Sequence, residues 1–232
     1  MMKRANEIID KVSALTDSVV LMHSMSGKDS IALLDMLYPK FKRIVCVYMY
    51  VVKDLRHIAE YSAFIRKRYD GVETVQVPHF AWFSYKRNGF MGSEKLPIHK
   101  NYCLYDIVDT TRKRLGIEWV CLGFKQSDSL NRLLMLRSLK DGNESIMWKS
   151  KWFFPLSTYK NADVMDYISD NNLKSPERYG GKSKSSGTDI TDYWYLRYLR
   201  EHYPDDLEKV YAEYPQTKFI IAQHERDTKG KQ

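Results

Sequence analysis

The sequence predicts an α/β protein, in which a mainly parallel five-stranded sheet carries helices on both faces. The alternation of two kinds of segment supports this fold. Apolar runs with the length of buried strands alternate along the chain with segments in which apolar residues recur at helical spacing. Such alternation is typical of parallel strands joined by helices. The clearest example is residues 19–37, VVLMHSMSGKDSIALLDML, which read as a buried strand, a turn of mostly small residues and a helix.

The other elements of this fold follow in chain order. A leading helix is expected over residues 8–15. We expect strands over residues 19–22, 43–52, 73–77, 118–124 and 152–156. We expect the joining helices over residues 30–37, 55–69, 104–115, 130–139 and 161–171. The helix after the first strand should end at Tyr38, because Pro39 disfavours helical geometry in the residue before it.

Residues 79–101 break the alternation. They combine aromatic and basic side chains with two glycines, so we expect a long irregular segment. Its aromatic and basic side chains either stack on a base and hold phosphate, or they pack over one end of the sheet. A second, shorter polar turn is expected at residues 140–143.

The character of the chain changes again after residue 175. Residues 179–189 are rich in Gly, Ser and Lys and predict a flexible loop. A tyrosine-rich helical segment broken near Pro204 should follow over residues 192–214, and the end of the chain, 225–232, should be frayed. The predicted organisation is an α/β domain over residues 1–175, followed by a loop and helical extension over residues 176–232.

The net charge, the length of the apolar runs and the cysteines indicate which partners and which cellular setting to expect. The 232 residues carry 37 Lys and Arg against 29 Asp and Glu, a formal charge of +8 that favours an anionic partner such as a nucleotide or nucleic acid. Solubility alone would account for this charge equally well. No apolar run approaches the roughly 20 residues of a membrane span, so no membrane partner is expected. The cysteines Cys46, Cys103 and Cys121 fit no disulfide or zinc pattern, which indicates a reduced, cytoplasmic setting.

The turn after the first strand holds the clearest functional signal. A tight turn between a buried strand and a helix directs free N–H groups and the positive end of the helix dipole at one point, which suits an anion. It is not the usual P-loop, because Asp29 stands where Ser or Thr is needed. Residues 25–30, MSGKDS, resemble the SGGKDS loop of PP-loop ATP pyrophosphatases, in their phosphoadenylylsulfate (PAPS) reductase branch, with departures at Met25 and Ser26. The alternative is an ordinary strand-turn-helix with a solvated lysine and a capping aspartate.

Two further segments resemble the same family. Residues 123–132, GFKQSDSLNR, resemble the Gly-x-Arg-x-x-Glu-Ser-x-x-Arg segment that follows strand four in PAPS reductase relatives, with Lys125 and Asp128 as like-charge replacements. Residues 154–168, FPLSTYKNADVMDYI, resemble the family's Pro-Leu, Trp, Asp-Val, Tyr-Ile run. The resemblance thus covers most of residues 19–171, and it implies a Rossmann-like, three-layer α/β/α fold of the adenine nucleotide alpha-hydrolase type.

The resemblance implies roles for particular residues. The phosphates of the nucleotide would lie on the turn after the first strand, and the adenine near the end of the second strand. The implied nucleotide-binding residues are Ser24, Met25, Ser26, Gly27, Lys28, Asp29, Ser30, Tyr48, Met49, Tyr50, Gly123, Lys125, Ser129 and Arg132. The implied catalytic residues are Lys28, Asp29, Lys125 and Arg132. Asp29 is either a Mg²⁺ contact or a capping residue.

Three functions stay open. The first is an enzyme that cleaves ATP between the α and β phosphates, adenylylates an unknown acceptor and releases pyrophosphate. The second is PAPS reduction, although the family's late cysteine is missing because no cysteine follows Cys121. In that case the thiol would come from Cys103 or from a partner. Cys103 precedes a predicted helix, and it is either a small core residue or a reactive thiol. The third is a nucleotide-sensing or nucleic-acid-associated module without turnover.

The resemblance also implies the cofactors. ATP or PAPS is expected with Mg²⁺, and no iron–sulfur cluster is expected because paired cysteines are absent. The expected partners are an adenine nucleotide and an acceptor, with nucleic acid and a homo-oligomer left open.

Overall fold

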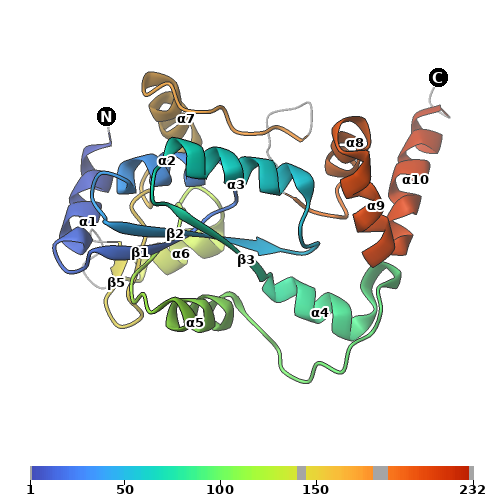
Figure 1. The fold of residues 1–232 in the computed structure, drawn as a ribbon, viewed down its shortest axis with the longest axis horizontal. Helices are drawn as coiled ribbons and strands as arrows, with labels where there is room; N and C mark the ends of the chain where they lie inside the picture. Colours follow the sequence, from blue (N-terminus) through green and yellow to red (C-terminus); the bar gives the residue numbers. More distant parts are fainter. Residues whose placement is uncertain (1, 140–144, 180–187, 230–232) are drawn as a thin grey trace. The chain divides into compact units, whose positions relative to one another are not determined.

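The structure, a computed structural model, describes residues 2–139, 145–179 and 188–229. The expected turn at 140–143 and most of the expected loop at 179–189 lie outside the described residues. Within them, the strands form one six-stranded sheet of order β3-β2-β1-β4-β6-β5, with helices on both faces (Figure 1). The strands are β1 (Ser18–Met22), β2 (Arg43–Tyr50), β3 (Glu73–Pro78), β4 (Val120–Cys121), β5 (Ile146–Met147) and β6 (Trp152–Phe153).

Ten α-helices and two short 3-10 helices occur in the described part of the chain. The α-helices are α1 (Lys3–Ser13), α2 (Lys28–Leu37), α3 (Arg56–Arg68), α4 (Phe80–Asn88), α5 (Leu104–Leu115), α6 (Leu130–Arg137), α7 (Asn161–Asp170), α8 (Tyr193–His202), α9 (Pro204–Glu213) and α10 (Lys218–Lys229). The 3-10 helices are η1 (Phe90–Gly92) and η2 (Pro215–Thr217). None of the helices that the structure describes has the length and apolar character needed to cross a membrane.

The predicted parallel sheet with the first strand at its centre is confirmed. β1 pairs in parallel with β2 and with β4, so that Val20 lies opposite both Val45 and Val120. β4 pairs in parallel with β6, and β5 pairs antiparallel with β6. The predicted number of five strands is wrong, because the prediction missed β5, the antiparallel strand at one edge of the sheet.

The chain divides into two compact units. Unit 1 consists of Met1–Tyr48, Phe64–Val75 and Val108–Pro176, and unit 2 consists of Met49–Ala63, Gln76–Ile107 and Glu177–Gln232. The boundary expected after residue 175 stays a prediction.

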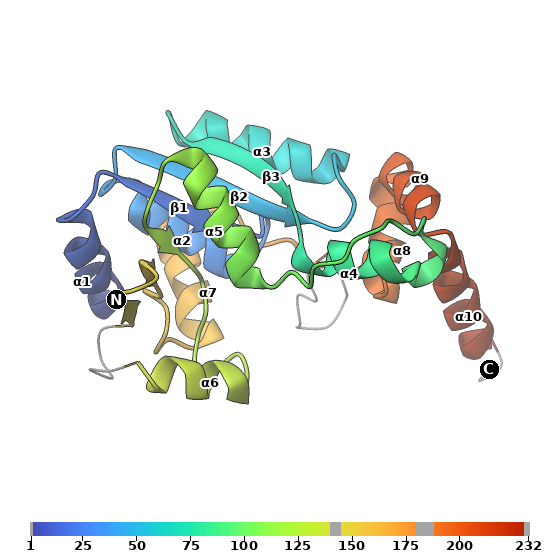
Figure 2. The ribbon, with the colours of Figure 1, turned by 90° about the horizontal axis from the view of Figure 1, so that it is seen from below.

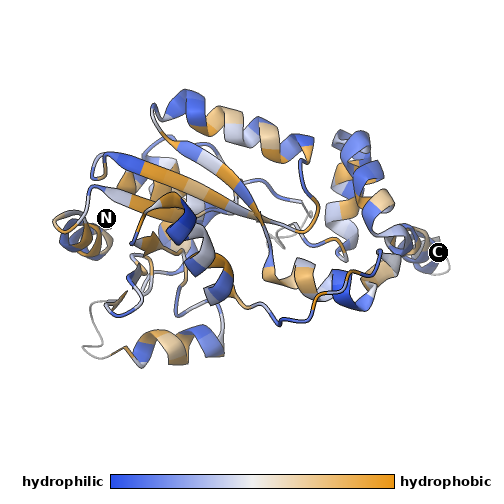
Figure 3. Ribbon diagram, turned by 60° about the horizontal axis from the view of Figure 1, so that its bottom comes forward, coloured by the Kyte–Doolittle hydropathy of each residue, from blue (hydrophilic) through white to orange (hydrophobic). Residues whose placement is uncertain are grey.

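The core of unit 1 is built on β1. Val19, Val20 and Leu21 are fully buried, and apolar residues dominate the central strands in Figure 3. Burying each such side chain contributes about 1.5–3 kcal/mol to the free energy of unfolding. Figures 1 and 2 show α2 and α7 on one face of the sheet and α5 on the other. This layering holds the turn after β1 at an edge of the sheet.

Hydrogen bonds to one aspartate on α2 reinforce this layer. Asp35 accepts from the hydroxyl of Tyr167 on α7 at 2.8 Å and from that of Tyr69 at 3.2 Å. Burial raises the pKa of Tyr167, and the hydrogen bond to Asp35 adds to that shift. α2 ends where predicted, with Tyr38 as its C-cap residue, directly before Pro39.

In unit 2 the irregular segment expected over residues 79–101 is wrong in part, because α4 and η1 lie within it. The His79 side chain accepts from the N–H of Ala81 at the start of α4, and Gly89 ends that helix with a left-handed φ of 66°. α4 is apolar on more than one side, so helical spacing was hard to detect in its sequence.

The helical segment broken near Pro204 is confirmed. α8 and α9 meet there, and Pro204 occupies the first position of α9, where its missing N–H has no cost. The frayed end expected over 225–232 is wrong for residues 225–229, which belong to α10. Residues 230–232 lie outside the described residues.

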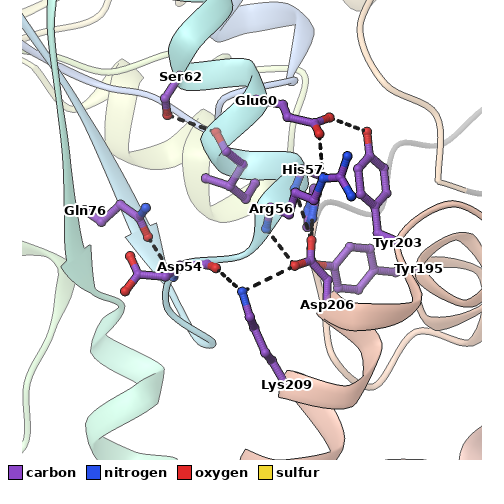
Figure 4. Close-up of polar contacts among 11 residues, drawn as sticks. Asp54, Arg56, His57, Glu60, Ser62, Gln76, Tyr195, Tyr203, Asp206 and Lys209 are labelled. Atoms are coloured by element: carbon purple, nitrogen blue, oxygen red, sulfur yellow. Dashed lines mark hydrogen bonds and ion pairs between the residues drawn. The ribbon is translucent and has the colours of Figure 1, made fainter.

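A buried carboxylate organises unit 2 (Figure 4). Asp206 on α9 is fully buried and accepts from the backbone N–H of Arg56 at 2.6 Å and of His57 at 3.0 Å, so it caps the first turn of α3. Its Oδ2 also lies 2.8 Å from Nδ1 of His57. Burial raises the pKa of Asp206, but these hydrogen bonds outweigh it and hold the pKa below its ordinary value.

We predict that replacing Asp206 destabilises the protein far more than replacing its neighbour. Asp206→Asn removes the charge and one acceptor oxygen, and should lower the free energy of unfolding by about 2–4 kcal/mol. Asp205→Asn is the matched control, because it removes the same charge from the first turn of the same helix at an exposed position. Urea denaturation followed by circular dichroism measures both. Equal stability of the two variants would contradict the capping role.

Candidate functional site

The candidate site lies where β1 ends. The backbone N–H of His23 donates to the carbonyl of Val47 at 2.9 Å, so the parallel ladder continues one residue past β1. The chain then turns through residues 24–27 and enters α2 at Lys28. The turn therefore lies at the carboxyl end of the central strand, as predicted, and this edge is where open parallel sheets bind ligands.

Hydrogen bonds within the turn close it on itself. Ser30 Oγ accepts from the backbone N–H of Ser24 at 2.9 Å, and the two hydroxyl oxygens lie 3.0 Å apart. Met25 adopts a left-handed backbone with φ of 59°, and its N–H donates to Nδ1 of His23 at 2.8 Å. The turn thus has a defined shape before any ligand arrives.

Gly27 is needed for space. Its φ of −79° and ψ of 137° suit any residue, but a Cβ built there would lie 2.2 Å from Ser24 Oγ. Because glycine has no side chain, Gly27 offers no cap to the N–H groups of the first turn of α2. These groups and the positive end of the helix dipole are arranged as an anion site requires.

A buried ammonium group joins the turn to the segment after β4. Lys125 is fully buried, and its Nζ lies 2.7 Å from Asp29 Oδ1 and 3.0 Å from Asp128 Oδ1. A buried charge is stable only when it is paired, and here two carboxylates share it. The other oxygen of Asp29 lies 3.2 Å from Nζ of Lys28. Two lysines and two aspartates therefore form one charge-balanced cluster.

Gly123 lies beside Asp29, which is in the first turn of α2. A Cβ at Gly123 would lie 3.0 Å from Cβ of Asp29 and 3.5 Å from Cδ1 of Leu33. The absence of a side chain at Gly123 therefore leaves room for Asp29 in the first turn of α2. The structure thus brings together the turn, Gly123 and Lys125 of the predicted site.

Ser129 and Arg132 have local partners. Ser129 begins α6, and its hydroxyl accepts from the backbone N–H of Arg132 at 3.2 Å. The Arg132 guanidinium lies 3.2 Å from the ring centroid of Phe124, and burial lowers its pKa. A role of either side chain in nucleotide binding stays a prediction.

The residues predicted to lie near adenine fall in both units. Tyr48 is buried in unit 1. Met49 and Tyr50, the last residues of β2, belong to unit 2, where both are half-buried. Burial raises the pKa of Tyr50, as do the nearby carboxylates of Glu213 and Asp54. Their position relative to the nucleotide stays a prediction.

Two residues of the site were not predicted to belong to it. His23 holds the Met25 amide, and Asp128 holds the Lys125 ammonium. In the sequence, Asp128 stands out only as a like-charge replacement in the family's segment. Its spacing of three residues from Lys125 is the available signal of an ion pair. For His23 the available signal is its position two residues before Met25, where its ring nitrogen can accept a hydrogen bond from the Met25 N–H.

The cysteines lie in contrasting settings. Cys46 and Cys121 are buried in the strands of unit 1, and burial raises the pKa of Cys46 to about 12. Burial raises the pKa of Cys121 as well. Cys103 in unit 2 is exposed, with Sγ 3.1 Å from Oδ2 of Asp106, so the alternative of a core residue is wrong. Among the described residues, no three or more His, Cys, Asp or Glu side chains gather as a metal site would require.

Comparison with known proteins reveals similar folds only. No family model matches the sequence, and no curated protein matches it. One similar structure is U34-tRNA thiolase NcsA from Methanococcus maripaludis with its [4Fe-4S] cluster, at 16% identity over 97% of this chain and 78% of that chain, with a TM-score of 0.49. Another is NH3-dependent NAD synthetase from Campylobacter jejuni subsp. jejuni NCTC 11168 in complex with the nitrate ion, at 13% identity over 95% of this chain and 96% of that chain, with a TM-score of 0.47.

One of these structures corrects the cofactor prediction. ATP or PAPS with Mg²⁺ was expected without an iron–sulfur cluster, yet NcsA contains a [4Fe-4S] cluster. The exclusion rested on the lack of paired cysteines in the sequence. That ground is insufficient, because cluster ligands gather in space and need not be neighbours in sequence.

We predict that Gly27 and Ser24 are energetically coupled. Gly27→Ala forces the Ser24 hydroxyl away from Ser30 and should lower the free energy of unfolding by about 1–3 kcal/mol. Ser24→Ala should restore room for the new methyl group, since Ser24 Cβ lies at an ordinary 3.4 Å from it. A double-mutant cycle by urea denaturation measures the coupling. Additive effects of the two substitutions would rule out this steric account.

Proposed function

We propose that this chain is an adenine-nucleotide-binding PP-loop protein of the PAPS reductase-like branch, and that it cleaves ATP between the α and β phosphates. The adenylyl group would pass to an acceptor, and pyrophosphate would leave. The observation that carries the proposal is the closed turn at the carboxyl end of β1, with Lys28 at the start of α2 and buried Lys125 beside it. The turn matches the family's loop in its last four residues.

The proposed chemistry assigns the turn to the leaving group. A nucleophilic atom of the acceptor attacks the α phosphorus, the bond from that phosphorus to the bridging oxygen breaks, and the acceptor's proton passes to solvent. Negative charge grows on pyrophosphate, where the N–H groups of the first turn of α2 and the Lys28 ammonium stabilise it. Asp29 holds Lys28 and Lys125 on its two oxygens, so it keeps both ammonium groups at the turn.

The family's reductase chemistry provides the main alternative function. It requires an accessible thiol, and Cys103 is exposed whereas Cys46 and Cys121 are buried. A binding module without turnover is the remaining alternative, and it would bind nucleotide without releasing pyrophosphate. A cytoplasmic location belongs to the proposal, and the three free cysteines support it.

We predict that Lys28 contributes to binding of both ATP and pyrophosphate. Lys28→Ala should weaken binding about 10- to 100-fold, the usual worth of a charge-assisted hydrogen bond. Lys42→Ala is the matched control, because Lys42 forms an exposed ion pair with Asp17 in the same unit. Titration calorimetry and a pyrophosphate-release assay test this. The proposal fails if the wild-type chain releases no pyrophosphate from ATP with any acceptor, or if the two variants bind equally.

We predict that Cys103→Ser leaves pyrophosphate release unchanged within about twofold, because adenylyl transfer needs no thiol. The substitution keeps a hydrogen-bond donor beside Asp106, so the start of α5 should be preserved. Cys103→Ser turnover is compared with wild type, with the melting temperature as a control. Loss of turnover at unchanged melting temperature and nucleotide affinity would replace adenylyl transfer with a redox mechanism.

A further inference from the structure

We infer that His23 is a positioning residue of the candidate site, whose imidazole sets the turn in the conformation that receives pyrophosphate. The inference rests on the proposed function and deepens it, because it assigns the origin of the turn's shape to one side chain. It concerns residues of unit 1 alone.

The geometry at His23 makes it a fixed acceptor. Its backbone belongs to the parallel ladder through Val47, and 3% of its surface is exposed. Nδ1 accepts the Met25 N–H at 2.8 Å, which requires Nδ1 to be unprotonated and the ring to be neutral. Burial lowers the pKa of His23 to about 3, so the ring stays neutral at physiological pH. The neutral ring with its proton on Nε2 therefore provides this acceptor at physiological pH.

The bond acts where the turn is under strain. Met25 has a left-handed φ of 59°, which costs free energy in any residue with a side chain. Its side chain is fully buried, so the conformation also packs an apolar group beneath the turn. By holding the Met25 amide, His23 stabilises this conformation. The neighbouring residue, Ser24, is held by Ser30, whose Oγ lies 3.0 Å from the Ser24 Oγ.

The same bond occurs elsewhere in the chain. His79 Nδ1 accepts from the N–H of Ala81 at 3.0 Å, again two residues on, at the start of α4. This pattern reproduces the Asx turn, in which Asn or Asp accepts from the N–H two residues later. Asn Oδ1 is separated from Cα by the same number of bonds as His Nδ1, whereas Gln Oε1 lies one bond farther. Asn should therefore replace His23, and Gln should not.

The test compares three variants of the full chain with one control. His23→Ala and His23→Gln should accelerate hydrogen exchange at the Met25 amide at least about tenfold and weaken binding of inorganic pyrophosphate about tenfold, as loss of one hydrogen bond predicts. His23→Asn should restore both values to within about threefold of wild type. His79→Ala removes the same kind of bond at α4 and should lower the melting temperature without changing pyrophosphate affinity.

The outcomes separate this inference from the proposed function. If His23→Asn and His23→Gln fold and bind pyrophosphate equally, the positioning role is overturned, even if His23→Ala fails to fold. If the wild-type chain does not bind pyrophosphate, the proposed function is overturned. The Met25 exchange rates then decide by themselves whether His23 sets the turn.

Discussion

The buried ammonium of Lys125 is the interaction on which the candidate site depends. A charge without exposed surface is tolerated only beside opposite charge, and Asp29 and Asp128 provide it at 2.7 and 3.0 Å. Asp29 comes from the first turn of α2, whereas Asp128 comes from the segment after β4. The pairing therefore holds two separate strand-to-helix connections against each other at the carboxyl edge of the sheet. Gly123 permits this approach, since any larger residue would meet Asp29.

Much of the fold could be predicted because its signals are local. The apolar run of β1, the helical spacing of α5 and the effect of Pro39 on α2 each act within a few residues, and the structure reproduces them. β5 and α10 were missed because they lack such local signals. α10 is rich in charged residues. Its contacts within unit 2 include buried Ile221 and the ring of His224, whose centroid lies 3.5 Å from that of Tyr193. Such stabilisation by distant residues leaves no periodic pattern in the sequence.

The site was predictable only as far as its backbone. The turn at 24–30 and the segment from Gly123 follow from motifs, and the structure brings Lys125 to the turn. The contacts that each side chain makes could not be predicted from these motifs. Ser129 is a helix cap and Arg132 stacks on Phe124, because these contacts depend on how the segment folds back after β4. The expectation of no iron–sulfur cluster rested on cysteine spacing, which does not by itself give proximity in space.

The cap on α3 has a consequence for synthesis of the protein. Asp206 lies 150 residues after Arg56, whose N–H it accepts. During translation the first turn of α3 leaves the ribosome with its amide groups uncapped, and it stays so until α9 has emerged. Contacts of such long sequence separation slow folding, because a long loop must close before they form. Unit 2 therefore completes its folding only after α9 has been synthesised, and until then the first turn of α3 lacks the cap that Asp206 provides.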